Sequence, residues 1–178
     1  MKESLIATLR DRNTSMEAFR EASHQLANLL AAEIALTHDQ VLLLPILRAG
    51  MALLPSFMAV FKKARVSFIG IHRDKNAIPH LYYEKIPPLS SHDYTIILDP
   101  MVATGGSTLL TLEKIQEKGG NPAHCHVVGM IGAPEGVAAI KKSYPETKTT
   151  LAVLDKGLDA KKYIVPGLGD FGDRFFGC

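Results

Sequence analysis

The apolar residues of this chain fall into short, nearly continuous runs that alternate with longer amphipathic stretches. The first expected helix begins at the capping-box sequence Thr14–Glu17 and keeps apolar residues at helical spacing to about Ile34. The runs Val41 to Ile46 and Val66 to Ile71 have the length and continuity of strands that are buried on both faces. The apolar stretch between them, Met51 to Phe61, is long enough for a helix. The chain is therefore expected to form a strand, a helix and a strand by residue 71.

The second half of the chain repeats this alternation. Strands and helices are expected in turn at Tyr94 to Leu98, Thr108 to Glu117, His126 to Ile131, a helix opened by Pro134, and Leu151 to Leu154. The segment from His80 to Pro88 breaks the pattern and is interpreted as an added hairpin or a flexible flap, whose Tyr82 and Tyr83 could stack on a base or pack on the sheet. After Leu154 the chain becomes irregular and rich in glycine. The alternation predicts an α/β fold with a mostly parallel central sheet flanked by helices.

Length and composition fit one domain over residues 1–178, since a chain of this size forms one hydrophobic core more readily than two. Apolar residues make up 47% and charged residues 21%, which differs from the composition of a disordered chain. The formal net charge is only +2 and no basic run exceeds two residues, so the charge does not predict nucleic-acid binding. The sequence contains no run of about 18 apolar residues, the length that would predict a membrane span.

The two cysteines, Cys125 and Cys178, do not form a C-x-x-C pair and are expected to be reduced thiols of a cytoplasmic protein. The polar first turns contain no apolar stretch of the kind that directs secretion. The sequence His124-Cys125-His126 could suggest zinc, but on a strand the histidines and the cysteine point to opposite faces, and further ligands are missing. All three are interpreted as strand residues.

The most informative polar segment follows the expected strand Tyr94 to Leu98. In a parallel sheet, ligands bind beyond the carboxyl ends of the strands, where loops lead into helix N-termini. Glycines and hydroxyl side chains at this place let N–H and O–H groups surround a phosphate, while the next helix presents its positive end. The first residue of the segment, Asp99, is an acid placed to accept hydrogen bonds from sugar hydroxyls. The alternative is that the whole segment is an ordinary strand-to-helix turn without a ligand. The segment consists of Asp99, Pro100, Met101, Val102, Ala103, Thr104, Gly105, Gly106 and Ser107.

Other phosphate-binding motifs fit the sequence poorly. A nucleoside triphosphate loop needs a lysine next to its glycines, and none stands near Gly105 and Gly106. The spacing of Gly167, Gly169 and Gly172 matches the dinucleotide-binding pattern, but only six residues follow it, too few for a crossover helix and a second strand. Dinucleotide binding is therefore not expected.

Three segments resemble the signature segments of uracil phosphoribosyltransferases: Pro45 to Gly50, Asp99 to Ser107, and Tyr163 to Arg174. The resemblance extends with few gaps from about residue 9 to Gly177. It implies the type I phosphoribosyltransferase fold and the transfer of a phosphoribosyl group from 5-phosphoribosyl 1-diphosphate (PRPP) to uracil, giving UMP and diphosphate. A phosphoribosyltransferase for another base and a regulatory or ligand-binding protein with the same pocket are the alternatives that stay open.

Arg48 and Arg73 each follow an expected buried strand. A permanently charged guanidinium at the end of an apolar run is unfavourable unless an anion or a carboxylate meets it. The alternatives are structural ion pairs, with a core-edge acid for Arg48 and with Asp74 or Glu84 for Arg73. The resemblance implies instead that both arginines contact the diphosphate of PRPP and act with Asp99 in catalysis.

The glycine-rich tail is expected to hold the base, because glycines let the backbone approach a flat ring closely. Residues 156–178 are expected to form a hood over the base. Phe171 stands where many bacterial members of the family carry alanine, which puts the size of the pocket in question. Asp170 is also implied to face PRPP, together with Asp99 to Ser107. The resemblance implies uracil contacts at Ile164, Gly169, Asp170 and Phe171.

Mg²⁺ is the expected cofactor. Pro100 follows Asp99 where many phosphoribosyltransferases have a second acid, so the ion is expected to be held mainly by PRPP and water. Arg48, Arg73 and the metal can then stabilise the charge of the leaving diphosphate without a covalent nucleophile. The resemblance implies a homodimer and leaves a purine-nucleotide effector open. Between Ala35 and Val41 the chain is shorter than the family pattern, in an arm that commonly helps subunits to dimerise.

Overall fold

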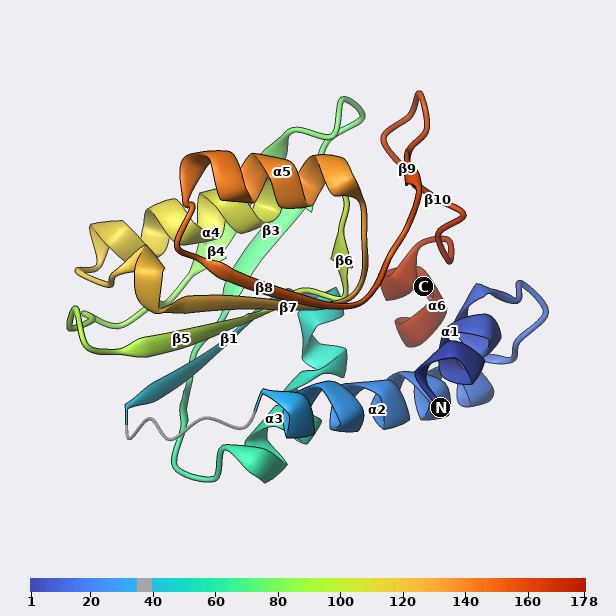
Figure 1. Ribbon diagram of the computed structural model, residues 1–178, viewed down its shortest axis with the longest axis horizontal. Coiled ribbons are helices and arrows are strands. Elements are labelled where there is room, and N and C mark those ends of the chain that lie inside the picture. The colour runs from blue at the N-terminus through green and yellow to red at the C-terminus, as the bar shows by residue number, and fades with distance from the viewer. Residues whose placement is uncertain (35–39) are drawn as a thin grey trace.

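The computed structural model describes residues 1–34 and 40–178, and an eight-stranded sheet runs through its centre (Figure 1). The strands are β1 (Val41–Leu47), β2 (Arg65–Val66), β3 (Ile69–Arg73), β4 (Pro79–Glu84), β5 (Tyr94–Leu98), β6 (Met101–Val102), β7 (Cys125–Gly132) and β8 (Lys148–Leu154). Their order is β4-β3-β1-β5-β7-β6, with β2 paired to β1 and β8 paired to β7. Every pairing is parallel except that of β4 with β3, so the expected mostly parallel sheet is confirmed.

Helices cover both faces of this sheet. The helices of the described residues are α1 (Lys2–Arg10), α2 (Met16–Glu33), α3 (Leu54–Val60), α4 (Gly106–Glu117), α5 (Pro134–Ser143) and α6 (Phe171–Phe176). Two 3-10 turns, η1 (Ala49–Ala52) and η2 (Pro122–His124), accompany them. Figure 1 shows α4 and α5 on one face and α2 and α3 on the other. Successive β1 side chains point to opposite faces, so Leu43 packs with the α2 and α3 residues while Leu42 and Leu44 pack with those of α4 and α5.

The C-terminal segment contains more regular structure than its glycine content predicts. Two short strands, β9 (Gly157–Leu158) and β10 (Ile164–Val165), form an antiparallel pair, and α6 follows them. The side chain of Asp170 caps α6 by accepting a hydrogen bond from the backbone N–H of Asp173 at 2.9 Å. Figure 1 shows both chain termini at this end of the molecule, with α6 beside α1 and α2.

The N-terminal elements differ from the expectation. The N-cap of α2 is Ser15, whose hydroxyl accepts a hydrogen bond from the N–H of Ala18 at 3.2 Å. The expected cap residue, Thr14, instead donates its hydroxyl to the carbonyl oxygen of Thr8 at 2.7 Å. Thr8 belongs to α1, a helix that was not among the elements expected from the sequence. The Thr14 hydroxyl therefore ties the two helices together.

Two other expected elements are divided in the structure. The stretch Met51 to Phe61 forms the end of η1 followed by the shorter helix α3. The run Val66 to Ile71 is split between β2 and β3, which contact different ends of β1. His124 lies in η2, so only Cys125 and His126 of the expected strand residues are on β7.

The segment from His80 to Pro88 supplies most of β4, which forms an antiparallel hairpin with β3 and confirms the hairpin interpretation. The expected shortening between Ala35 and Val41 falls mainly on residues 35–39, which lie outside the described residues.

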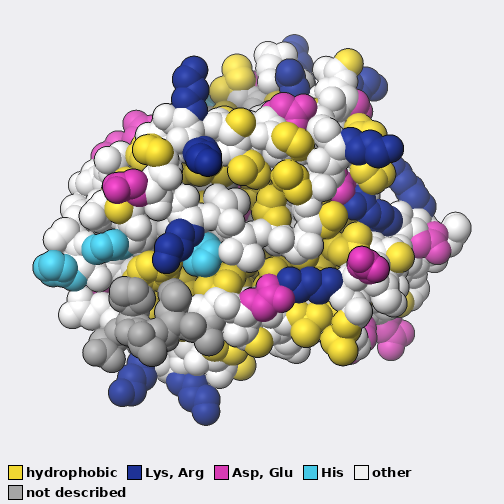
Figure 2. Space-filling view, in the orientation of Figure 1, with side chains coloured by type: hydrophobic (Ala, Val, Ile, Leu, Met, Phe, Trp, Pro, Cys, Tyr) yellow, Lys and Arg dark blue, Asp and Glu magenta, His cyan; other side chains and the backbone are white. Residues whose placement is uncertain are grey.

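Figure 2 shows the face of the molecule that carries β8 and α5. Lysine and arginine side chains are interspersed there with aspartate and glutamate. Among the helices of the described residues, none is both long and apolar enough to cross a membrane.

The acid stability of the fold depends on His126, which is 8% exposed on β7 and hydrogen-bonded through Nε2 to the Thr150 hydroxyl at 2.8 Å. Burial, and to a smaller extent the charge of Lys148, lower the pKa of His126 to about 4. In the unfolded chain the ring takes up a proton near pH 6.5, so its contribution to stability is present above that pH and is lost as the pH falls towards 4. Between pH 7 and pH 5 we expect this loss to be about 2 kcal/mol.

The measurement is urea unfolding of the wild type and of His126→Gln at both pH values. The variant should lose less unfolding free energy than the wild type over this interval. Equal losses in the two proteins would contradict the assignment.

Candidate active site

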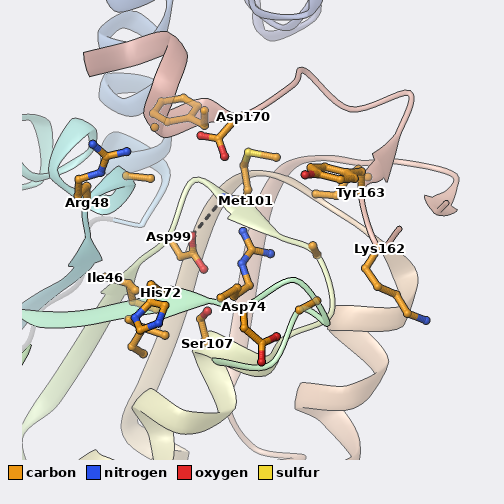
Figure 3. A pocket seen from close by; sticks show the side chains of 18 of the residues that line it. Ile46, Arg48, His72, Asp74, Asp99, Met101, Ser107, Lys162, Tyr163 and Asp170 are labelled. Carbon is orange, nitrogen blue, oxygen red and sulfur yellow. Dashed lines mark hydrogen bonds between the residues drawn. The ribbon is translucent and has the colours of Figure 1, made fainter. Parts of the chain in front are cut away.

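Polar side chains from three neighbouring parallel strands meet at the carboxyl edge of the sheet. Arg48 follows β1, Arg73 ends β3 and Asp99 follows β5. Because the strand order is β3-β1-β5, these side chains line one cavity, which has a volume of about 1030 Å³. Figure 3 shows Arg48 on one side of the cavity, Tyr163 on the opposite side and Asp99 between them.

Arg48 stands at the start of a tight loop. A Cβ on Gly50 would collide with the carbonyl oxygen of Leu98, so this loop can lie against the end of β5 only with glycine there. The Arg48 guanidinium pairs with Asp173 at 3.2 Å and donates to the Cys178 sulfur at 3.3 Å. Both members of the ion pair are more than half exposed, and such pairs contribute only about 0–1 kcal/mol. The structure therefore does not show the ion pair with a core-edge acid that was considered for Arg48. Because its pair with Asp173 is exposed, Arg48 can exchange Asp173 for another anion at little cost.

Arg73 does not form either of the ion pairs that were considered for it. Asp74 accepts from His80 at 3.1 Å, and Glu84 pairs with Lys118 at 3.1 Å. The charge of Arg73 acts instead on Asp99, whose pKa it lowers.

The loop between β5 and α4 has the shape of an anion-binding turn. Gly105 is the N-cap of α4 and has φ +81°, a conformation that favours glycine. A Cβ there would also lie 2.8 Å from the carbonyl oxygen of Gly136, so the loop packs closely on the start of α5. The N–H of Gly106 donates to the Thr104 hydroxyl at 3.3 Å. The N-terminus of a twelve-residue helix thus follows the short strand β6.

The loop residues do not all face the cavity. Met101, Ala103 and Ser107 line it, whereas Val102 and Thr104 to Gly106 line a small adjacent hollow that also borders Arg73 and Asp99. Pro100 borders neither space; its carbonyl oxygen accepts from the N–H groups of Met130 and Ile131, both at 3.0 Å.

Thr108 adds a hydroxyl group to the same hollow. Within residues 1–34 and 40–178, its Oγ1 is the only buried side-chain nitrogen or oxygen atom without a hydrogen-bond partner. An unpaired buried hydroxyl is costly, so a hydrogen bond from this atom to a bound water or ligand would be favourable.

Asp99 has the most strongly perturbed carboxyl group of the site. Burial raises its pKa to about 6, although Arg73 and a 3.3 Å hydrogen bond from the Met101 N–H oppose this shift (Figure 3). The residue is nevertheless partly exposed to the cavity. Ionised Asp99 is therefore held at a cost in the absence of a ligand, and hydrogen-bond donors from a ligand would lower that cost.

The C-terminal segment forms the other wall of the cavity. Phe171 is 1% exposed, and its ring packs on Phe19 and Phe175 with centroid distances of 5.2 and 5.7 Å. The phenylalanine side chain thus packs in the core, although the residue also borders the cavity. The residues of this wall that the resemblance assigned to the base are Ile164, Gly169, Asp170 and Phe171.

Several other residues that line the cavity were not among the expected site residues. His72 and Tyr82 come from the β3–β4 hairpin, and Lys161, Lys162 and Tyr163 come from the turn between β9 and β10. Tyr163 is 58% exposed, and Figure 3 shows it beside Met101. The sequence carried a signal for Tyr163, since it begins the third signature segment; nothing in the pattern pointed to Lys161 or Lys162.

Comparisons with known proteins agree on one family. A family model described as uracil phosphoribosyltransferase matches residues 33–178. The uracil phosphoribosyltransferase of Symbiobacterium thermophilum is 36% identical over 97% of this chain and 92% of its own length. The corresponding protein of Limosilactobacillus reuteri is 34% identical over the same shares of both chains.

Solved structures show the same fold. The AQ2163 protein from Aquifex aeolicus superimposes with a TM-score of 0.90 at 31% identity, covering 98% of this chain and 93% of that chain. A purine phosphoribosyltransferase from Pyrococcus horikoshii superimposes with a TM-score of 0.53 at 14% identity, covering 62% of this chain and 72% of that chain. The second likeness concerns the fold alone. The architecture is that of the type I phosphoribosyltransferases.

The raised pKa of Asp99 predicts that this residue destabilises the ligand-free protein. An acid whose folded pKa is above its unfolded value reduces stability as the pH rises from about 4 to about 6, and the reduction persists at higher pH. We expect Asp99→Asn to raise the unfolding free energy at pH 8 by about 1–2 kcal/mol, after allowance for partial solvent exposure. The gain should shrink towards pH 4. Urea unfolding at both pH values measures it, and a variant less stable than the wild type at pH 8 would refute this account.

Proposed function

The chain belongs to the uracil phosphoribosyltransferase family, and from this premise we propose that it transfers the phosphoribosyl group of PRPP to uracil, with UMP and diphosphate as products. The observation that carries the proposal is that Arg48, Arg73 and Asp99 border the same cavity as the glycine-rich C-terminal segment. Ser107 of the anion-binding loop borders it too, and Thr104 to Gly106 line the hollow beside it. A phosphate-bearing sugar and a flat base can therefore meet in one place.

PRPP would lie along the edge of the sheet. Its 5-phosphate would occupy the loop from Thr104 to Ser107, where the positive end of α4 and the unpaired hydroxyl of Thr108 favour an anion. Asp99 would accept hydrogen bonds from the ribose hydroxyls. Arg48 and Arg73 would bind the diphosphate from two strand ends, with Arg48 leaving its exposed partner Asp173.

Uracil would lie against the C-terminal wall, with residues 156–178 as its hood. A pyrimidine edge needs an acceptor for a ring N–H and donors for its carbonyl oxygens, and backbone groups can supply all of these. Ile164 and the segment Gly169 to Phe171 border the cavity and are the proposed contacts, while Asp170 would also face PRPP. The φ of +84° at Gly169 lets the backbone turn there without a side chain between it and the base.

The reaction joins a uracil nitrogen to the anomeric carbon of the ribose while the bond from that carbon to diphosphate breaks, and the proton of that nitrogen passes to the leaving diphosphate or to water. Positive charge develops on the ribose and negative charge on the leaving group. The residues of this site can promote the reaction by holding both substrates in line and by stabilising the diphosphate with Arg48 and Arg73. No covalent intermediate with the protein is needed.

Mg²⁺ is proposed as the cofactor, because the residues present fit an ion that its substrate largely holds. Asp99 is followed by Pro100 rather than by a second acid, so this strand end offers the ion a single carboxylate. Among the described residues, no group of three His, Cys, Asp or Glu side chains is placed to hold a metal ion. When bound with PRPP, the ion would neutralise diphosphate charge, with Asp99 and water as its other contacts.

Other features expected from the family resemblance stay proposals. Free Cys125 and Cys178 support a cytoplasmic location, where thiols remain reduced. The homodimer is testable by sedimentation, and the purine-nucleotide effector by assaying turnover with and without added purine nucleoside triphosphate.

The first test compares bases. Purified protein with Mg²⁺ and PRPP should release diphosphate with uracil but not with hypoxanthine, adenine or orotate. A coupled diphosphate assay measures release, and chromatography identifies UMP. Equal turnover of a purine would refute the assignment of the base, and the absence of turnover with any base would favour a ligand-binding protein.

The second test concerns Arg48. We expect Arg48→Ala to lower kcat/KM for PRPP by about 100-fold or more, because the lost charge meets the diphosphate. Its exposed ion pair contributes little, so Tm should move by less than about 4 °C. Arg12→Ala, at an exposed position in the turn after α1, is the matched control and should leave both values near those of the wild type. If Arg48→Ala unfolds the protein, the residue is structural and the proposed role is wrong.

A further inference from the structure

The backbone of the C-terminal wall is held in place by a residue from the first helix of the chain. Arg10, at the end of α1, donates through Nη1 to the carbonyl oxygen of Gly167 at 2.8 Å and to Asp155 Oδ2 at 2.9 Å. Its Nη2 also pairs with Asp155 Oδ1. The N–H of Gly167 donates to Asp155 Oδ2 at 2.9 Å. Both polar groups of Gly167 are therefore fixed by one ion pair.

Asp155 connects this contact to the central sheet. It follows β8 directly, and its N–H donates to the carbonyl oxygen of Gly132, the last residue of β7, at 2.8 Å. Its side chain is 3% exposed, and a buried carboxylate of this kind needs such charged and hydrogen-bonded partners. The position of Gly167 is thus set relative to β7 and β8, and β7 pairs with β5, after which Asp99 borders the cavity.

The segment that Arg10 and Asp155 hold is a tight turn. Gly167 has φ +61°, and a Cβ on it would collide with the carbonyl oxygen of Ile164. Ile164 and Gly169, on either side of this turn, both line the cavity. A displacement of Gly167 would therefore move the backbone of Ile164 and Gly169 together.

A second arginine holds the next residue. Arg174 Nη1 donates to the carbonyl oxygen of Leu168 at 2.7 Å and also to that of Leu9, while its Nη2 donates to that of Asp11 at 2.6 Å. The end of α1 is thus joined to consecutive carbonyl groups of the turn, through Arg10 and through Arg174. This arrangement leaves the turn little freedom to move away from the cavity.

We propose that Arg10 and Asp155 are positioning residues that hold the backbone of Ile164 to Gly169 in the geometry that recognises the base. The inference rests on the proposed placement of uracil at this wall. Neither residue is among those that line the cavity, so each acts through the backbone it holds. Because the phosphate loop, Arg48 and Arg73 belong to other elements, loss of the contact should weaken the use of uracil and spare that of PRPP.

The test is steady-state kinetics of the full chain with Arg10→Ala, Arg10→Lys and Asp155→Asn. We expect KM for uracil to rise by about tenfold or more in Arg10→Ala and Asp155→Asn, since small misplacements at a site are costly. KM for PRPP should stay within about twofold of the wild type. The KM for uracil of Arg10→Lys should lie between those of the wild type and Arg10→Ala. An ammonium group keeps the charge but lacks the fork that reaches both Asp155 and Gly167.

Lys2→Ala is the matched control, since Lys2 also lies on α1 and forms an exposed ion pair with Glu33. It should leave both KM values unchanged. A lower Tm with unchanged KM for uracil, or equal rises in both KM values, would show a merely structural contact and overturn the proposal. If Arg10→Ala fails to fold, Arg10→Lys and Asp155→Asn decide the question by the same criteria.

Hydrogen exchange of the Gly167 to Gly169 amides separates this proposal from the proposed function. Exchange should be faster in Asp155→Asn than in the wild type and unchanged in Lys2→Ala. Unchanged exchange in Asp155→Asn would overturn the positioning role. Absence of uracil turnover in the wild type would refute the proposed function instead.

Discussion

The parallel pairing of β1 with β3 and β5 is the constraint on which the site depends. Parallel neighbours bring their carboxyl ends to the same edge, so Arg48, Arg73 and Asp99 become neighbours although they are far apart in the sequence. The apolar side chains of these strands pack against helices on both faces, which leaves the ends of the strands as the place for polar groups. The fold thus decides where the chemistry takes place.

The charges at this edge are arranged for a ligand rather than for stability. Burial raises the pKa of Asp99, Arg48 is paired only with an exposed acid, and the Thr108 hydroxyl is buried without a partner in the described part of the chain. Each of these features is unfavourable or weak in the free protein and would become favourable in the proposed complex with an anion and sugar hydroxyls. The well-paired charges, such as Arg10 with Asp155, lie behind the cavity wall.

Sequence patterns predicted the sheet well and the periphery less well. Buried strands such as β1 and β5 are continuous apolar runs, and the loop from Asp99 to Ser107 carries local glycine and hydroxyl signals. Helix α1 carries only a short apolar pattern around Ile6 and Leu9, and its role appears only through contacts with residues about 145–165 positions away. The inward packing of the Phe171 ring was equally hidden, since it depends on Phe19 in α2. Local patterns report local structure, whereas these contacts are decided by packing.

In the proposed mode of binding, donor and base share one cavity, with the phosphate at the sheet edge and the base at the C-terminal wall. A crystal structure of the protein with bound UMP tests this most directly. We predict the phosphate of UMP within hydrogen-bond distance of the backbone of Thr104 to Ser107, and the uracil ring against Ile164 and Gly169 to Phe171. A nucleotide bound with its base away from this wall, or with its phosphate outside the loop, would contradict the account.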